Sequence, residues 1–298
     1  MSLPQVTGVR ALITDDLVKG LLTSHHPDLA DLEIGRHYTR QEHVTVRVGD
    51  DWGVRLPLRV ELDPYYARVL GIIRQFRHTW DFPFSGPIRV GLPCEAFPYH
   101  WEVTNWITAS NASLVPLLDR AGTDLGGALR QIHSPALKNA PANPRTMPPL
   151  ANLSNAFARL LARVQGNRPA GVHIKRSVLV KVWNAGLEAD RDMADTWTHG
   201  RLEPRAVLSD QGKMAGLLMW EFLGAGDPAA DLGRASTLFR PEAQEQMFAA
   251  YGSLSSHSRS RLAAHQAIGL LLFVSLEDHA LVRAASNRLV DYGFAQRQ

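Results

Sequence analysis

Two short runs of alternating side chains near the start of the chain constrain its fold most strongly. Residues His43–Val48 and Trp52–Leu58 alternate apolar and polar positions, and a Gly-Asp-Asp sequence over 49–51 lies between them. Alternation with period two is typical of a strand with one buried face, and a short connection of Gly and Asp indicates a hairpin. The sequence therefore predicts an antiparallel hairpin over 43–58, within a β-rich N-terminal region.

Further elements complete this predicted N-terminal lobe. Thr14 stands before Asp15 and Asp16, which predicts a helix start with an acidic first turn. The order of the elements is helix, hairpin, helix and two strands, which makes residues 1–106 a small lobe. The elements predicted around the hairpin are helices over 15–24 and 63–77 and strands over 87–92 and 101–106.

The chain becomes mainly helical after a short polar connector. Residues 107–113 are expected to be a hinge that leads into a helical C-terminal lobe over 114–298. The segment 134–149 contains five prolines and is predicted to be a loop. A short β region is expected over 206–208 and 214–220. The helices of this lobe are predicted over 114–118, 124–133, 153–165, 177–190, 241–252, 258–274 and 277–294.

Composition excludes several classes of protein. The chain has 298 residues, a formal net charge of +3 and a single cysteine, Cys94, so it has neither an intramolecular disulfide nor a cysteine-based zinc cluster. Its basic residues are scattered, which argues against nucleic-acid binding. The sequence shows no apolar run of the roughly 18 residues that a membrane span needs, and no signal-peptide pattern. We therefore expect a cytoplasmic protein that binds neither nucleic acid nor membrane.

Three segments together resemble the aminoglycoside/macrolide phosphotransferase family. The hairpin segment Val48–Pro57 ends in a basic residue before Leu-Pro, and Thr196–Leu208 follows the family's catalytic loop, His-Gly-Asp-Leu-His-Pro-Gly-Asn. The third segment, Gly216–Trp220 with Gly226–Leu232, is similar to the family's metal-binding strand and the Gly-Asp-Pro-Ala-x-Asp-Leu helix start. The resemblance implies a two-lobed, protein-kinase-like α+β fold. Fold does not determine function, so the site residues need a separate reading.

The residues of the resembling segments depart from the family at the positions that carry the chemistry. The family's catalytic Asp falls on Arg201, its metal-binding Asn on Ala206 and its second metal-binding Asp on Met219. An arginine accepts no proton, alanine has no side-chain oxygen, and a thioether is too soft for magnesium. The resemblance thus predicts a pseudokinase without metal or other cofactor. Asp227 and Asp231 are retained, and we expect them to cap a helix rather than bind a metal.

The catalytic loop leaves four candidate functional residues: His199, Arg201, Glu203 and Arg205. Two roles are open for His199, either holding the loop through backbone hydrogen bonds or acid–base work. Two arrangements are open for the arginines. Glu203 pairs with one of them as an internal latch, or both arginines face an anionic ligand.

The nucleotide side of the resembling region is also altered. The family's glycine-rich turn is placed over residues 35–40, where only the first residue is glycine. Bulky side chains therefore stand where backbone amides would approach a phosphate. Arg55 falls on the family's phosphate-contacting basic residue. His37, Tyr38, Arg40 and Arg55 are the candidate ligand-binding residues of this lobe.

The function predicted from these residues is that of a non-phosphorylating descendant of the family. Such a protein would bind a peptide, metabolite or partner protein in a cleft between the lobes, where Arg55, Arg201 and Met219 are expected to converge. The partner could be an active kinase or lyase of the same pathway. One alternative is a zinc-free cyclase that adds a cysteine thiol to a dehydroamino acid in a lanthipeptide-type pathway. A second, disfavoured by Arg201, is an active antibiotic phosphotransferase.

Overall fold

The structure, a computed structural model, describes residues 13–39, 42–167 and 171–297. The chain forms two compact units, each of which is described by itself below. Unit 1 comprises Met1–His78 and Phe84–Thr108, and unit 2 comprises Thr79–Pro83 and Ala109–Gln298. The chain therefore enters unit 2 briefly before it completes unit 1. The second boundary lies within the predicted connector over 107–113.

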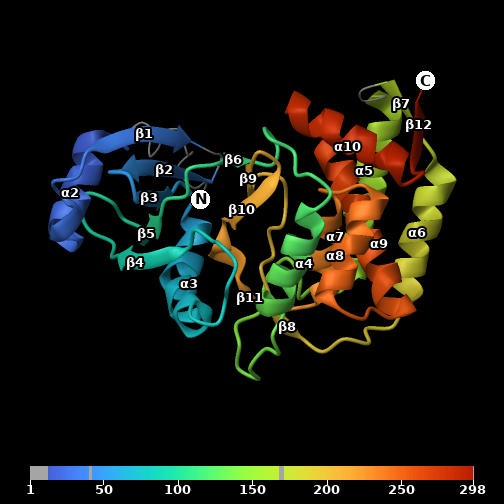
Figure 1. Ribbon diagram of the computed structural model, residues 1–298, viewed down its shortest axis with the longest axis horizontal. Helices are drawn as coiled ribbons and strands as arrows, with labels where there is room; N and C mark the ends of the chain where they lie inside the picture. Colours follow the sequence, from blue (N-terminus) through green and yellow to red (C-terminus); the bar gives the residue numbers. More distant parts are fainter. Residues whose placement is uncertain (1–12, 40–41, 168–170, 298) are drawn as a thin grey trace, which may run out of the picture. The chain divides into compact units, whose positions relative to one another are not determined.

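Unit 1 is built on an antiparallel sheet of five strands in the order β1-β2-β3-β5-β4 (Figure 1). The predicted hairpin is confirmed as β2 (His43–Val48) and β3 (Trp52–Pro57). The two strands predicted after it are β4 (Pro87–Gly91) and β5 (Trp101–Asn105). Val54 pairs with both Val46 and Val103, so the buried positions of three strands lie side by side.

The first strand of the sheet corrects one prediction. Residues 35–40 were expected to form a turn, but Ile34–Thr39 is strand β1, antiparallel to β2. Its pairing shifts between Ile34 and His37, and this irregularity breaks the clean alternation that would have revealed a strand. The strand extends as far as Thr39.

Two helices bury apolar residues in unit 1. Helix α2 (Asp15–His25) is capped as predicted, because the Thr14 hydroxyl accepts a hydrogen bond from the amide of Leu17 at 3.2 Å. Its buried face packs with the inward residues of the sheet. Helix α3 (Asp63–Phe76) buries a stripe of four residues with helical spacing: Tyr66, Val69, Ile72 and Ile73.

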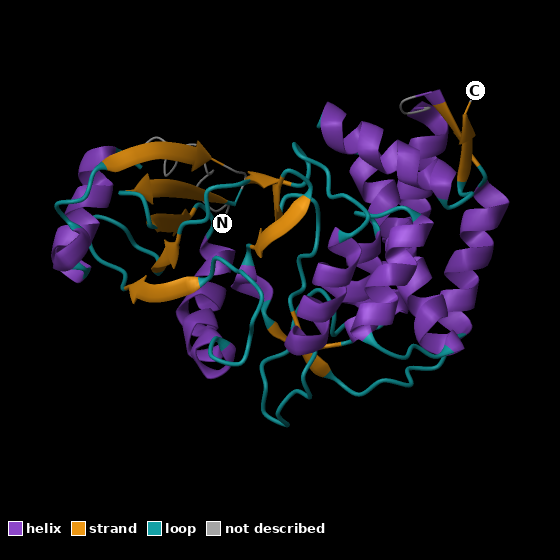
Figure 2. Ribbon diagram, viewed as in Figure 1, coloured by secondary structure: helices purple, strands orange, loops and turns teal. Residues whose placement is uncertain are grey.

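Unit 2 is mainly helical (Figure 2). Its long central helix α9 is buried on most sides, and α5, α6, α7 and α10 all pack against it. The predicted helices over 124–133, 153–165, 177–190 and the last third of the chain are confirmed within a few residues. The helices of unit 2 are α4 (Ala121–Ile132), α5 (Ser154–Asn167), α6 (Arg176–Glu188), α7 (Pro228–Ser236), α8 (Pro241–Tyr251), α9 (Ser256–Val274) and α10 (His279–Asp291).

Helices α4 and α8 approach closely because α4 presents glycines to its neighbour. A side chain at Gly122 would meet the carbonyl oxygen of Ala243 at 2.4 Å, and one at Gly126 would meet that of Met247 at 2.1 Å. Neither distance is possible for a real Cβ atom. At Gly127, one residue further along the same helix, an added Cβ would have no neighbouring atom within 4 Å. The contact therefore requires glycine at two positions only.

Short strands connect the helices of unit 2. Strand β6 (Ser110–Asn111) lies in the predicted connector and pairs with β9 (Val207–Asp210), which also pairs with β10 (Lys213–Leu217). Two further pairs are β8 (Thr196–Thr198) with β11 (Gly224–Gly226), and β7 (Val172–Ile174) with β12 (Ala295–Arg297).

One predicted helix of unit 2 is wrong. Residues 114–118 are irregular, with Leu114 and Leu118 exposed, because Pro116 lacks an amide hydrogen and the amide of Leu118 donates to the carbonyl of Gly212 instead. The proline-rich segment 134–149 is irregular, as predicted. None of the helices in the described part of the chain is both long enough and apolar enough for a membrane span.

Candidate functional site

The loop between β8 and β9 is held by one buried carboxylate. Asp231, on α7, accepts hydrogen bonds from the backbone amides of His199 at 2.6 Å and Gly200 at 2.8 Å. His133 Nε2 lies 3.3 Å from the same carboxylate. Burial acts to raise the pKa of Asp231, but its hydrogen bonds with His133 and the Gly200 amide hold the pKa below its usual range. Asp231 is therefore an anionic anchor for the loop, and not the helix cap that was expected.

His199 is fully buried, and both of its ring nitrogens are occupied. Nε2 is 2.8 Å from the carbonyl oxygen of Leu218, and Nδ1 accepts from the amide of Arg201 at 3.2 Å. A carbonyl only accepts and an amide only donates, so the ring must carry its proton on Nε2. Burial lowers the pKa of His199, which keeps the ring neutral. Of the two roles left open by the sequence, this geometry favours holding the loop.

Arg201 forms a buried ion pair where the resemblance places a catalytic carboxylate. Its Nη1 donates to Glu221 at 2.5 Å, and its Nε lies 3.5 Å from Glu203. The side chain of Glu221 is 1% exposed and that of Arg201 is 13% exposed. The sequence suggested Glu203 as a latch, and it does pair with Arg201. Glu221 was missed, although it stands two residues after Met219 in the resembling segment.

The two positions where the resemblance places metal ligands are occupied by apolar side chains. Ala206 is completely buried and Met219 is 8% exposed. Met219 adopts a left-handed backbone conformation, with φ of 68°, which is uncommon for a residue with a side chain. Magnesium requires hard oxygen ligands, and these positions offer only a methyl group and a thioether. The residues present therefore do not fit the metal that the fold family uses.

Arg205 belongs to a different contact. Its Nη2 donates to Asp278 at 2.7 Å, and Asp278 also caps α10 by accepting from the amides of Ala280 and Leu281. The catalytic-loop candidates are thus all engaged within unit 2: His199 with backbone, Arg201 with two carboxylates and Arg205 with a helix cap.

The candidates in unit 1 are also engaged. Arg55 is buried, with Nη1 3.2 Å from Glu102 and Nη2 3.3 Å from His43 Nδ1. Glu102 lies directly opposite Arg55 across the β3–β5 pairing, so an alignment of strands could have identified it. The pair holds the Arg55 charge inside unit 1.

The other candidates of unit 1 lie on β1 or just after it. His37 Nε2 is 2.7 Å from Asp15, on α2, and Tyr38 packs its ring against Trp106 at 5.3 Å between centroids. Arg40 lies outside the described residues. Both described candidates therefore make contacts within unit 1.

A pocket of about 330 Å³ opens beside the loop, within unit 2. Three arginines line it, Arg145, Arg201 and Arg234, together with the carboxylates of Glu203 and Asp231. Apolar side chains from α5, α9 and the segment just before α5 also line it, and they are called its apolar wall below: Leu153, Ala156, Leu160, Ile268 and Leu272. No pattern in the sequence predicts this pocket, because its lining residues are spread along the chain from Pro144 to Leu272.

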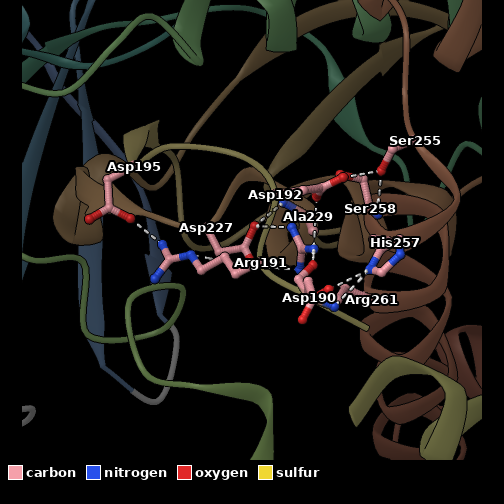
Figure 3. A network of polar contacts seen from close by, with 10 residues as sticks. All are labelled: Asp190, Arg191, Asp192, Asp195, Asp227, Ala229, Ser255, His257, Ser258 and Arg261. Atoms are coloured by element: carbon pink, nitrogen blue, oxygen red, sulfur yellow. Dashed lines mark hydrogen bonds and ion pairs between the residues drawn. The ribbon is translucent and has the colours of Figure 1, made fainter. Parts of the chain in front are cut away.

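A second polar network holds the segment between α6 and β8 (Figure 3). Arg261, on α9, donates to Asp227 at 3.0 Å and to Asp192 at 3.0 Å. Hydrogen bonds from Ser255 and Ser258, followed by the one from Arg261, hold the pKa of Asp192 well below its usual range. Asp227 also caps α7 as expected, since it accepts from the amide of Ala229 at 2.9 Å. These contacts hold the segment between α6 and β8 against α7 and α9, so we assign the network a structural role.

Comparisons with known proteins agree with this architecture. Residues 38–265 match the family described as the phosphotransferase enzyme family. The GDP complex of wild-type aminoglycoside 2'-phosphotransferase-IIIa is similar with a TM-score of 0.62 and 10% identity, covering 94% of this chain and 99% of that chain. Macrolide 2'-phosphotransferase MphH from Brachybacterium faecium is similar with a TM-score of 0.55 and 18% identity, covering 91% and 96%.

A third similar structure is aminoglycoside phosphotransferase APH(3'')-Id from Streptomyces rimosus, with a TM-score of 0.54, 18% identity and coverage of 86% of this chain and 99% of that chain. At such low identity these structures show the fold alone, and they confirm the predicted kinase-like α+β class. No curated protein matches the chain.

Proposed function

We propose, from the premise that this chain belongs to the phosphotransferase enzyme family, that it is a non-phosphorylating member that binds a ligand through unit 2. The observation that carries the proposal is the ion pair of Arg201 with buried Glu221 at 2.5 Å. A guanidinium at this position accepts no proton from a substrate hydroxyl. It also places a fixed positive charge where the family's chemistry needs a carboxylate.

The cost to catalysis follows from what phosphoryl transfer requires. The reaction depends mainly on positioning and on neutralising charge with metal ions and cations. Losing a positioned general base alone typically lowers a rate by about 10²–10⁴. Here the metal positions Ala206 and Met219 also lack oxygen ligands. The Asp231 anchor and His199 nevertheless keep the loop ordered, which supports a retained binding role.

Two other functions remain predictions from the sequence. The first is antibiotic phosphorylation, since the similar structures are named as aminoglycoside and macrolide phosphotransferases. Those names give the activity of those proteins and not of this chain. A thiol-adding cyclase would need a base, and the structure gives both ring nitrogens of His199 a backbone partner. No contact among the described residues favours this activity over binding.

Nucleotide binding and turnover test the proposal directly. The purified protein would be melted with and without Mg-ATP or Mg-GTP. A ligand at 100 times its Kd stabilises a fold by about 2.7 kcal/mol, which a melting curve resolves. We expect no magnesium-dependent shift and no ADP or GDP release with aminoglycoside or macrolide substrates. An active family enzyme serves as the positive control, and magnesium-dependent turnover by this chain would refute the proposal.

A further inference from the structure

The pocket beside the loop combines one charged wall and one apolar wall. On the charged wall, both carboxylates already have partners. Glu203 lies 3.5 Å from Arg201, and Asp231 accepts from two backbone amides. On the apolar wall, aliphatic side chains of α5 and α9 face the same space. A ligand that fills the pocket therefore meets both guanidinium groups and hydrocarbon.

Arg234 has hydrogen-bonding capacity left. It lies on α7, three residues after Asp231, and its Nη1 is buried without a hydrogen-bond partner among the described residues. Its side chain packs against α9 at Gly269, where an added Cβ would meet Nη1 at 2.9 Å. Glycine at that position thus makes room for the guanidinium. Nη1 is shielded by that contact, so it is not the atom that a ligand in the pocket would reach. Arg234 nevertheless lines the pocket, is only half-buried and has no ion pair among the described residues, and a guanidinium in that position suits an anionic ligand.

The other charged groups around the pocket do not supply that anion. Arg145 lies at an exposed position with its guanidinium 4.1 Å from the ring centroid of Phe222, and adds a second positive charge. His265 also lines the pocket, and burial lowers its pKa to about 4, so it is neutral at pH 7. A polycation would meet like charges here, whereas an anion would meet Arg145 and Arg234.

We infer that this pocket binds an organic acid: a carboxylate held by Arg234, attached to an apolar body that packs against α5 and α9. The inference rests on the proposed function, since it names the ligand class of the same unit. A guanidinium suits a carboxylate because its planar set of donors matches the two carboxylate oxygens. A volume of about 330 Å³ is at the small end of ligand pockets, so the ligand is a small molecule or the last residues of a peptide.

Calorimetric titration with matched pairs of acids and neutral amides tests this inference. Octanoate is paired with octanamide, and N-acetyl-Ala-Leu is paired with its C-terminal amide. We expect saturable binding of at least one acid and none of its amide. The tighter acid distinguishes a free small molecule from a peptide C-terminus. No saturable binding of either acid, or equal binding of acid and amide, would overturn the inference.

Variants locate the binding. Arg234→Gln is expected to weaken acid binding by about 10- to 100-fold, which corresponds to losing a hydrogen bond to a charged group. The matched control is Arg205→Gln, on the adjoining loop but paired with Asp278 outside the pocket, which should leave binding unchanged. Because Arg234→Gln could fail to fold, Ala156→Glu provides a second variant that places a competing carboxylate at the partly buried apolar wall.

The outcomes separate this inference from the proposed function. Loss of binding in Arg234→Gln or Ala156→Glu, with binding kept in Arg205→Gln, supports the acid pocket. Equal affinity in all three variants and the unchanged protein would place the acid elsewhere and overturn it. Mg-ATP turnover is measured on the same samples. Turnover refutes the non-phosphorylating role whether or not an acid binds, whereas absent acid binding without turnover refutes the pocket alone.

Discussion

Replacing Arg201 by alanine is expected to destabilise the fold more than replacing its partner Glu221 by glutamine. Arg201→Ala removes a guanidinium from a carboxylate whose side chain is 1% exposed. Glu221→Gln leaves Arg201 with Glu203 at 3.5 Å and with some access to water. The two substitutions remove opposite members of one ion pair, and they should therefore lower the free energy of unfolding by different amounts.

The magnitude follows from the geometry of the pair. Two unit charges about 4 Å apart attract by about 4 kcal/mol at an effective dielectric constant of about 20. Removing one partner of a buried pair typically costs about 3–5 kcal/mol, because the other group stays desolvated. We expect that loss in the free energy of unfolding for Arg201→Ala. For Glu221→Gln we expect about 1.5–3 kcal/mol, the cost of a hydrogen bond to a charged group.

Urea unfolding followed by tryptophan fluorescence at pH 5 and pH 8 measures both values. A buried carboxylate without its guanidinium takes up a proton more readily than one in water. The native variant then binds more protons than the unfolded chain, so its stability falls as pH rises. The decrease in the free energy of unfolding caused by Arg201→Ala should accordingly be smaller at pH 5 than at pH 8. Adding Glu221→Gln to this variant should restore part of the lost stability. A cost below about 1 kcal/mol at pH 8, typical of an exposed pair, would refute this reasoning.

Four further substitutions test other parts of the structure. Gly126→Ala should destabilise the contact of α4 with α8 by about 1–3 kcal/mol, whereas Gly127→Ala should stabilise by about 0.5–1 kcal/mol, both from urea midpoints. Arg261→Leu should cost about 3–5 kcal/mol at pH 7. Because the pKa of Asp192 is lowered in the folded protein, it contributes stability at pH values above the usual pKa of an Asp, and this contribution is lost on acidification. Without Arg261 part of that contribution is absent, so the stability of the variant should depend less on pH below pH 4. Thr14→Ala should cost about 1 kcal/mol in thermal melts, and no change would disprove the cap.

Much of the fold could be predicted because its signals are local. The hairpin over 43–58 shows strand alternation, and the helix at Asp15 follows a capping threonine. Strand β11 was missed because it has only three residues, too few for a period to appear. The helix expected over 114–118 has apolar residues, but a proline and a bond to Gly212 override their helical preference.

The site was harder to predict than the fold because its partners are distant in sequence. The resembling motifs were enough to assign Arg201, Ala206 and Met219 to the positions of the family's catalytic and metal-binding residues. Glu221 follows Arg201 by twenty positions, and it lies in the short 3-10 helix Trp220–Phe222 that begins after Met219. Arg234 carried no motif signal at all. We single it out because it lines the pocket and has no ion pair among the described residues, and both facts depend on how the helices pack.

The brief excursion of Thr79–Pro83 into unit 2 affects how the chain can fold during synthesis. In the finished protein Trp80 stacks on Trp220 with 5.0 Å between ring centroids, and both rings are buried. Trp220 is translated roughly 140 residues after Trp80, which at about 5–20 residues per second takes about 7–28 seconds. During that interval the first unit can form its sheet while an aromatic segment protrudes without its partner. A newly made chain thus displays an apolar segment suited to chaperone binding, and no single cut of the backbone would yield two complete units.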